Sequence, residues 1–314
     1  MRLYKPQGTI ETLEQLLADP EIAQSLVAHQ ILPERPAQTA PFPGWLDKRL
    51  VRALHGQGIE KLYTHQAESL ESLKRGDDIV VVTPTASGKS LCFNLPVLQS
   101  VAEDPAARSL YLFPTKALSQ DQLAAFRELA DAADIAVAAG VYDGDTPNPI
   151  RHNIRAAGQV VVTNPDMLHS AILPHHTKWF QLFEQLRYIV IDETHSYRGI
   201  FGSHVANVLR RLLRLCDHYG SRPQIICCSA TIGNPKELAE MLTGRQMTVV
   251  DRNGAPAGEK HVVILNPPVI DVRQGIRPGP LALSHRAALA FLRSGRQTIV
   301  FAKARVAVEL LLTS

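Results

Sequence analysis

A short segment combines the residue types that bind phosphate groups. Residues 83–90 read TPTASGKS, and they lie between a β-branched run at 79–83, which predicts a buried strand, and a helical pattern. Apart from a threonine in place of the first glycine, the segment matches G-x-x-x-x-G-K-[ST]. In such a loop Gly88 lets the backbone approach the phosphates, while Lys89 reaches the β- and γ-phosphates. The hydroxyl of Ser90 would bind Mg²⁺. The alternative is a plain Ser/Gly-rich turn that caps a helix.

Two adjacent carboxylates follow another apolar run. Residues 186–195 read LRYIVIDETH, which predicts a buried strand ending at Asp192 and Glu193. In a parallel sheet, both carboxylates would lie at the same edge as the phosphate loop. There Asp192 would hold Mg²⁺ through a water, and Glu193 would orient or deprotonate the attacking water. This pairing predicts phosphoryl transfer, and a solvated loop at a strand end is the alternative.

The elements that must position these residues alternate between strand and helix. Strands are expected at about 79–83, 109–113, 136–141, 159–163, 187–191, 224–228 and 247–250. Helices are expected at about 46–55, 64–75, 89–100, 116–130, 166–172, 203–218 and 235–243. Such alternation predicts an α/β fold with a mostly parallel sheet between helix layers. Ligands of such sheets bind at the carboxyl ends of the strands.

The first part of the chain differs from this regular region. Residues 1–45 carry two short helical patterns, Ile10–Leu17 and Ile22–His29, followed by several prolines that exclude a helix. We therefore expect an N-terminal extension before a domain over residues 46–255.

The last part of the chain begins another unit. Residues 256–314 are interrupted by glycine and proline and then resume an α/β pattern. The expected elements are a helix at about 281–294, a strand at about 297–302 and a helix at about 304–312. One strand and two helices cannot cover a parallel sheet on both faces, so this segment is predicted to be a linker and the incomplete start of a second domain.

Composition and charge exclude several classes of protein. The chain has 314 residues, of which 45% are apolar, which is typical of a globular protein. No apolar run approaches the roughly 18 residues that cross a bilayer, and the N-terminus lacks the apolar stretch of a signal peptide. A cytoplasmic protein is therefore expected. The net charge of +3 is too small to argue for a nucleic-acid partner by itself.

The cysteines and histidines offer no pattern typical of a metal site. Cys92, Cys216, Cys227 and Cys228 form no C-x-x-C pair, so they are expected to be reduced and mostly buried, with no redox role. His169, His175 and His176 have no cysteine or carboxylate at ligand spacing. We therefore expect no zinc site in this chain.

The phosphate loop and the acidic strand end together resemble the ATP-binding core of superfamily 2 helicases, the DEAD/DEAH-box kind. Other segments resemble further motifs of that family: LYTHQ at 62–66 (Q motif), PTKALSQ at 114–120 (motif Ia), TNPDML at 163–168 (motif Ib) and SAT at 229–231 (motif III). The resemblance covers about residues 60–235, in the family's order. It implies a RecA-like P-loop NTPase domain and a nucleic-acid-dependent ATPase.

The resemblance also implies the roles of individual residues. ATP would be bound by Tyr63, Gln66, Thr83, Thr85, Ala86, Ser87, Gly88, Lys89 and Ser90, with Mg²⁺ held at Ser90 and Asp192. Catalysis and its coupling to a second domain would involve Lys89, Asp192, Glu193, His195, Ser229 and Thr231. Nucleic acid would be contacted by Thr115, Lys116, Gln120, Thr163, Asn164 and Asp166. The amide of Gln66 can pair with both N6 and N7 of adenine, which would explain a preference for ATP.

Finer features resemble one branch of the family, the MrfA-type (YprA-like) helicases, which are related to the eukaryotic Hrq helicases. The segments concerned are YDGDTP at 142–147, ILPHH at 172–176, YRGIFGSH at 197–204 and ANVLRR at 206–211. This branch is DNA-directed, with 3′-to-5′ translocation and repair roles. The implied partner is DNA, single-stranded or with a single-stranded tail, and an RNA-directed helicase of the same superfamily stays open.

The sequence also departs from the family pattern. Residues 298–305 (TIVFAKAR) resemble motif IV of a second RecA-like domain, but motifs V and VI and the branch's zinc-binding cysteine cluster do not follow. An arginine finger from such a domain contributes roughly 10³–10⁵ in turnover, so the chain alone is expected to be a poor ATPase. The alternative is a module that binds ATP and DNA without useful turnover.

Overall fold

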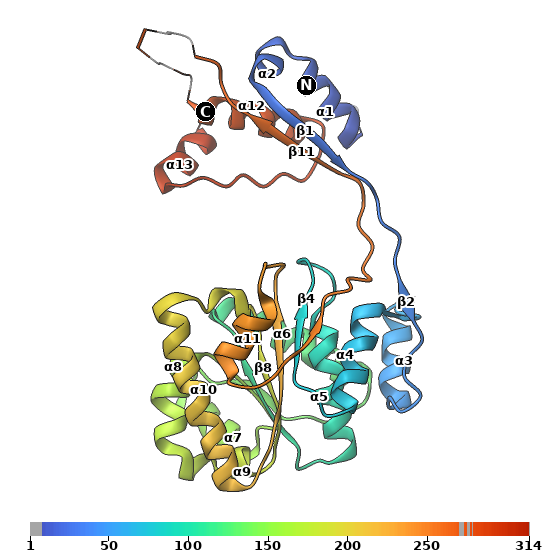
Figure 1. Cartoon of the computed structure of the whole chain (residues 1–314), viewed down its shortest axis with the longest axis vertical. Coiled ribbons are helices and arrows are strands. Elements are labelled where there is room, and N and C mark those ends of the chain that lie inside the picture. The colour runs from blue at the N-terminus through green and yellow to red at the C-terminus, as the bar shows by residue number, and fades with distance from the viewer. Residues whose placement is uncertain (1–7, 270–272, 275–276, 278, 314) are drawn as a thin grey trace. The chain divides into compact units, whose positions relative to one another are not determined.

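The computed structural model describes residues 8–269, 273–274, 277 and 279–313. The chain forms two compact units. The central unit is Pro36–Pro256, and the terminal unit joins Met1–Arg35 with Ala257–Ser314. Figure 1 follows the chain through both units.

The central unit is built on a seven-stranded sheet in which all neighbouring strands are parallel. In order across the sheet, the strands are β10 (Thr248–Val250), β4 (Ile79–Val82), β9 (Gln224–Ser229), β8 (Leu186–Ile191), β5 (Arg108–Leu112), β7 (Val160–Thr163) and β6 (Ala139–Val141). Strands β4 and β7 are buried at every position, because helices cover both sides of the sheet. The predicted α/β fold with a mostly parallel sheet between helix layers is confirmed.

The two faces of the sheet have separate apolar clusters. Side chains alternate along a strand, so Ile79 and Val81 of β4 belong to one cluster and Val80 and Val82 to the other. The first cluster includes residues of α3 (Lys48–Gly56), α4 (Thr64–Lys74), α5 (Ser90–Glu103) and α6 (Lys116–Ala132). The second includes residues of α7 (Asn148–Ala157), α9 (Phe180–Glu184), α10 (Gly199–Tyr219) and α11 (Pro235–Thr243). Both helix layers can be followed in Figure 1.

A second, very short sheet lies near the N-terminal start of the central unit. Strand β2 (Thr39–Ala40) pairs antiparallel with β3 (Leu62–Tyr63), which directly precedes α4. The sequence patterns did not predict this pairing. It ties the start of the central unit to the N-terminus of a helix that carries predicted site residues.

Two expected elements of the central unit differ in extent. The strand expected at 136–141 is limited to β6, because its neighbour β7 begins opposite the first residue of β6. The helix expected at 166–172 is one turn, α8 (Pro165–Met167), followed by a π-helical turn (Leu168–Ile172) and a 3-10 segment (Leu173–Trp179).

The terminal unit joins both ends of the chain through strand pairing. Its elements are α1 (Thr9–Ala18), α2 (Pro20–Ser25), β1 (Leu26–Leu32), β11 (Lys260–Leu265), α12 (Pro280–Arg293) and α13 (Arg305–Thr313). The helix predicted over Ile22–His29 is wrong beyond Ser25, because the next residues form β1 and pair antiparallel with β11. The partner strand lies more than two hundred positions away, so local periodicity cannot reveal it.

The strand predicted at 297–302 is also wrong: the described residues of this segment form neither strand nor helix. Ile299, Val300 and Phe301 are exposed there, and Phe301 is 91% exposed. A strand needs a hydrogen-bonded neighbour, and the described part of the terminal unit supplies none for this segment. The two helices predicted on either side are confirmed as α12 and α13. Among the described residues, no helix has the length and apolar character needed to cross a membrane.

Candidate functional site

Three neighbouring strands bring the predicted nucleotide site together. Residues 83–90 follow β4, Asp192 follows β8, and Ser229 is the last residue of β9, which lies between these two strands. Because the strands are parallel, all three groups lie at the carboxyl edge of the sheet. The topology therefore juxtaposes segments that are more than one hundred residues apart in the sequence.

The loop at residues 83–90 has the backbone shape of an anion cradle. Ala86 and Gly88 have φ angles of 62° and 78°, in the left-handed region. The hydroxyls of Thr83 and Ser87 hydrogen-bond to each other at 2.7 Å and are buried. This contact explains how a threonine replaces the first glycine of the motif, since its side chain closes the loop from within. Backbone turns with successive residues of this kind direct N–H groups towards an anion.

The lysine of the loop carries a positive charge that the described residues do not neutralise. Nζ of Lys89 donates hydrogen bonds to the carbonyls of Thr83 (2.8 Å) and Pro84 (2.9 Å), and no described carboxylate forms an ion pair with it. Ser90 begins α5, where backbone N–H groups and the helix dipole favour anions. Carbonyl contacts are readily exchanged for a charged phosphate oxygen.

Gln66 fixes the loop from the neighbouring helix. Its Oε1 accepts a hydrogen bond from the backbone N–H of Tyr63 (2.9 Å), and its Nε2 donates to the carbonyl of Gly88 (2.9 Å). The side chain is buried, and a Cβ added to Gly88 would lie 2.7 Å from Nε2. The amide therefore positions the phosphate loop. Each of its two polar atoms keeps one further hydrogen-bonding site, but the side chain is 2% exposed, and the adenine contact stays a prediction.

The two carboxylates have different surroundings. Asp192 is 7% exposed, and its pKa is raised to about 6, mainly by burial and further by the charge of Glu193. The backbone N–H of Glu193 and the charge of Lys89 oppose this rise in pKa. Glu193 adopts φ 50° and ψ 40°, a left-handed conformation that costs energy for a residue with a side chain. This strain lies where the strand turns away from the sheet.

His195 links the ends of β8 and β9. Its Nε2 lies 3.2 Å from Oε2 of Glu193, and its Nδ1 accepts a hydrogen bond from the backbone N–H of Ala230 at 3.2 Å. These partners assign the proton to Nε2. Ser229 is buried and donates its hydroxyl to the carbonyl of Ala230, whereas Thr231 is exposed. The structure thus brings Glu193, His195 and the SAT segment into one hydrogen-bonded chain.

The donors at this edge fit a magnesium ion. Magnesium prefers oxygen ligands and keeps several waters, and Ser90 and Asp192 supply a hydroxyl and a carboxylate. No hydrogen bond from the hydroxyl of Ser90 is found among the described residues. The raised pKa of Asp192 indicates a buried carboxylate without a full cationic partner. A divalent cation supplies that missing charge.

The residues predicted to contact nucleic acid lie at the end of β7 or after β5 and β7, which are neighbours in the sheet. Thr115 and Asn164 cap helices: Thr115 Oγ1 accepts from Leu118 N–H (3.4 Å) and Asn164 Oδ1 accepts from Met167 N–H (2.9 Å). Lys116, Gln120 and Asp166 are exposed at the same edge. Thr163 differs, because it is 1% exposed and its hydroxyl donates to the carbonyl of Tyr142 at 2.6 Å. The structure therefore places Thr163 inside the protein.

Sequence patterns missed a contact beside the phosphate loop. His65 is fully buried, and its Nδ1 accepts a hydrogen bond from the N–H of Gly254 at 3.3 Å. Its Nε2 has no partner among the described residues that meets the geometry of a hydrogen bond. Burial lowers the pKa of His65 to about 4, and the backbone of Ser87 partly offsets this shift. The LYTHQ and DRNGAPAG segments carry these residues, but nothing in either pattern says that they meet.

The cysteines are buried, and two of the three clustered histidines contact neighbouring side chains. All four cysteines are buried and free, and burial raises the pKa of the Cys92 and Cys227 thiols to about 12. Nδ1 of His169 lies 2.7 Å from Arg211, and Nδ1 of His176 lies 2.8 Å from the hydroxyl of Tyr219. Within the described ranges, no group of three or more His, Cys, Asp or Glu residues is arranged to hold a metal ion.

Known proteins resemble this chain in both sequence and fold. The "Uncharacterized ATP-dependent helicase YprA" of Bacillus subtilis is 54% identical over 303 residues, which cover 96% of this chain and 40% of that protein. The "ATP-dependent helicase HRQ1" of Saccharomyces cerevisiae is 36% identical, over 98% of this chain and 29% of that protein. The crystal structure of the DUF1998 helicase MrfA bound to DNA matches with a TM-score of 0.93 and 53% identity, covering 98% of this chain and 41% of that one. Our chain therefore spans less than half the length of these relatives.

A family model also covers the site. The model for the DEAD/DEAH box helicase matches residues 63–238, which is more than half of the chain and includes every predicted nucleotide contact. A DEAD-box helicase structure of 18% identity, Mss116, shares the fold with a TM-score of 0.56, as expected for a RecA-like domain. The matched range contains the phosphate loop and the acidic pair. The chain belongs to the DEAD/DEAH box helicase family.

Proposed function

We propose that the central unit binds ATP with Mg²⁺ and hydrolyses it as the nucleotide-binding half of a DNA helicase. The observation that carries this proposal is the convergence of the phosphate loop, Asp192 and Glu193 at one edge of the sheet. Phosphoryl transfer needs mainly positioning and charge neutralisation, and this edge supplies cations, N–H groups and carboxylates together.

Each residue has a role that its geometry supports. The backbone of residues 83–90 and the ammonium of Lys89 hold the phosphates, and Gln66 keeps the loop in shape. Ser90 and Asp192 would hold Mg²⁺, which when bound neutralises charge on the phosphate oxygens. Glu193 would orient the attacking water and accept its proton. Its contact with His195 connects this base to the SAT segment.

DNA is the nucleic acid that the comparisons favour. MrfA, which is 53% identical, has been solved bound to DNA and also bound to DNA with AMPPNP. In our chain, Thr115, Lys116, Gln120 and Asn164 lie at the carboxyl edge of adjacent strands, where hydroxyl, amide and ammonium groups can contact a phosphate backbone without reading its sequence. Asp166 lies at the same edge, where its backbone N–H, and not its carboxylate, would face a phosphate. Thr163 would support the neighbouring backbone from within. A role in DNA repair and the direction of translocation stay predictions.

We also propose that residues 256–314 begin a second RecA-like domain. Support comes from the apolar side chains of the TIVFAKAR segment, since Ile299, Val300 and Phe301 are exposed and would be covered by neighbouring strands and helices of such a domain.

The proposal is tested by ATP hydrolysis with and without single-stranded DNA. We expect DNA to stimulate hydrolysis, and Glu193→Gln to lower kcat by roughly 10²–10⁴-fold while ATP binding persists, because only the base is removed. Glu128→Gln is the matched control, since Glu128 is an exposed glutamate of α6 away from the site.

The outcomes separate the alternatives. Binding of ATP and DNA with no hydrolysis in the unmodified chain would support the module that binds without turnover. Stimulation by single-stranded RNA but not by DNA would indicate an RNA-directed helicase. Hydrolysis that survives Glu193→Gln would contradict the assigned base.

A further inference from the structure

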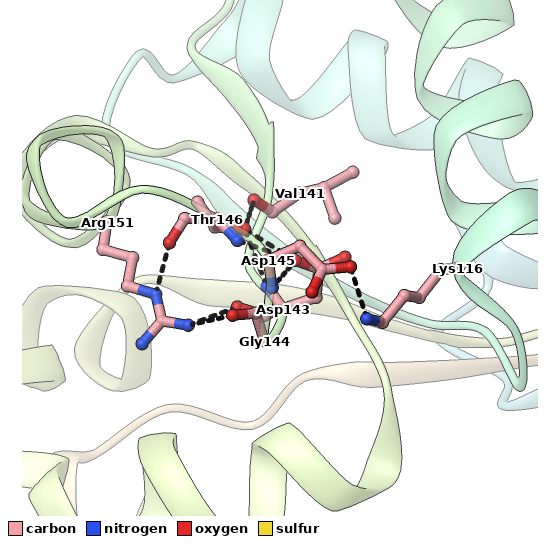
Figure 2. Close-up of polar contacts among 7 residues, drawn as sticks. All are labelled: Lys116, Val141, Asp143, Gly144, Asp145, Thr146 and Arg151. Atoms are coloured by element: carbon pink, nitrogen blue, oxygen red, sulfur yellow. Dashed lines mark hydrogen bonds and ion pairs between the residues drawn. The ribbon is translucent and has the colours of Figure 1, made fainter.

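The loop after β6 carries a carboxylate beside a predicted nucleic-acid contact. Oδ2 of Asp145 lies 2.5 Å from Nζ of Lys116, the first residue of α6 (Figure 2). Asp145 belongs to the YDGDTP segment, which the proposed ATPase chemistry does not use. A groove of about 460 Å³ lies between this loop and α6, lined in part by Lys116, Gln120, Asp143 and Asp145.

The loop is held rigid, so the position of Asp145 is set by its backbone. Oδ1 of the buried Asp143 accepts hydrogen bonds from the N–H of Asp145 (2.9 Å) and from the N–H and hydroxyl of Thr146 (3.0 and 2.9 Å). Arg151 donates to the carbonyls of Asp143 (2.6 Å) and Thr146 (2.8 Å), as Figure 2 shows. From the next strand, Thr163 donates to the carbonyl of Tyr142.

The ion pair itself is not needed for this rigidity. In the described part of the chain, Lys116 is the one hydrogen-bonding partner of the Asp145 carboxylate. The Lys116 and Asp145 side chains are 54% and 77% exposed, so solvent screens the pair and its contribution to stability is small. Asp145 also raises the pKa of Lys116, which keeps the lysine charged. The contact is therefore easy to exchange for another anion.

We propose that the carboxylate of Asp145 pairs with Lys116 when no nucleic acid is bound, and that it competes with a nucleic-acid phosphate for the ammonium of Lys116. This inference rests on the proposed nucleic-acid contact of Lys116. A bound phosphodiester must displace Asp145, and the displaced carboxylate stays close because the loop is fixed. The strand is therefore bound more weakly, and with less dependence on salt, than it would be by a lysine without Asp145. Weaker binding suits a strand that is released in every cycle of ATP hydrolysis.

The test is single-stranded DNA binding by the 314-residue chain and its Asp145→Asn variant, over a range of salt concentrations. Freeing Lys116 adds about one effective phosphate contact, so we expect roughly threefold tighter binding near 0.1 M salt. The plot of log affinity against log salt should become steeper by about 0.7. The variant leaves the backbone contacts of the loop in place, so the fold is retained.

Asp121→Asn is the matched control, because Asp121 is exposed on the same helix and forms no ion pair with Lys116. It removes the same charge without freeing the lysine. Lys116→Ala, made alone and together with Asp145→Asn, completes a double-mutant cycle for DNA binding. We expect Lys116→Ala to weaken DNA binding about threefold more when Asp145 is replaced than when it is present.

If Asp145→Asn and Asp121→Asn change DNA affinity equally, or if the effects of Lys116→Ala and Asp145→Asn are additive, the proposed competition is wrong. Either result would mean that only the overall charge of the chain matters. An unchanged salt slope would overturn it as well. The proposed function fails in a different way: the unmodified chain would then bind no nucleic acid and show no stimulated hydrolysis. If DNA binds but Lys116→Ala changes nothing in either background, the competition at Lys116 is refuted while the ATPase proposal stands.

Discussion

A side chain at Gly88 would have to displace the amide of Gln66, which hydrogen-bonds to the phosphate loop. The φ of 78° at Gly88 lies in the left-handed region, and an added Cβ would lie 2.7 Å from Nε2 of Gln66. Gly76 has a similar φ of 94°, but an added Cβ there meets no atom within 4 Å. An alanine at either position would strain the backbone, but only an alanine at Gly88 would also disturb Gln66. Comparing the two substitutions therefore distinguishes the effect of backbone strain from the effect of the Gln66 contact.

We expect Gly88→Ala to weaken ATP binding by at least tenfold, and Gly76→Ala to leave it unchanged. Both variants should lose about 1 kcal/mol of unfolding free energy, because alanine disfavours positive φ. Titration with a fluorescent ATP analogue measures the binding, and urea unfolding measures the stability. Equal nucleotide affinity in the two variants would show that the Gln66 contact does not shape the site.

The meeting of the predicted site residues at one sheet edge could be inferred from the sequence, whereas their side-chain surroundings could not, and their chemical roles stay predictions. The motif spacing predicted Lys89, Ser90, Asp192 and Glu193, and the structure brings them to one edge as expected for a parallel sheet. It could not show that the hydroxyl of Thr83 is bonded to Ser87, or that Thr163 is buried. Both facts depend on side-chain contacts and packing that a motif does not encode.

Helix α4 connects the phosphate loop to the segment that leaves the central unit. His65 and Gln66 are neighbours near its N-terminus: Gln66 holds Gly88, and His65 accepts the N–H of Gly254. The carbonyl of Gly254 accepts the N–H of Gln38, so the entering and leaving segments meet at this helix end. An added Cβ at Gly254 would lie 2.4 Å from the carbonyl of Gln38, which explains why glycine stands there.

The buried histidine predicts how stability depends on pH. Because the folded-state pKa of His65 is about 4 and the unfolded value is about 6.5, the unfolded chain binds an extra proton between these values. Neutral His65 makes its full contribution to the free energy of unfolding above pH 6.5. This contribution is lost as pH falls towards 4, by up to roughly 3 kcal/mol. We expect His65→Asn to flatten the fall in melting temperature between pH 7.5 and pH 5. His152→Asn, at an exposed position of α7, should leave the fall unchanged.

At the level of elements, prediction succeeded where pattern and neighbours agree. Strands β4 and β7 are continuous β-branched runs, and each pairs with a neighbouring strand on both sides. The terminal unit differs, because the helix predicted over Ile22–His29 overlaps β1 and the sequence pattern predicts no strand at β11. Their pairing is long-range and their side chains are largely exposed, so no buried face imposed a period on the sequence.

The two units differ in how much apolar surface they bury. Both apolar clusters that flank the sheet lie entirely within Pro36–Pro256. In the terminal unit, Ile22 is fully buried, but α12 has no buried residue and Val306 and Leu312 are exposed. The cooperative stability of the chain should therefore belong to the central unit, since apolar burial is the dominant favourable contribution to folding.

A fragment of residues 36–256 should therefore keep the main thermal transition of the whole chain, with a melting temperature within about 4 °C, and should still bind ATP. All predicted nucleotide contacts, from Tyr63 to Ser90, lie within it. In the whole chain, Ile22→Ala removes a buried side chain of the terminal unit, at a cost of about 2–5 kcal/mol to that unit, and should leave the main transition in place. Calorimetry and nucleotide titration measure both effects. A fragment that melts without cooperativity would show that β1 and β11 stabilise the central unit, and a main transition lowered by Ile22→Ala would show that the two units unfold together.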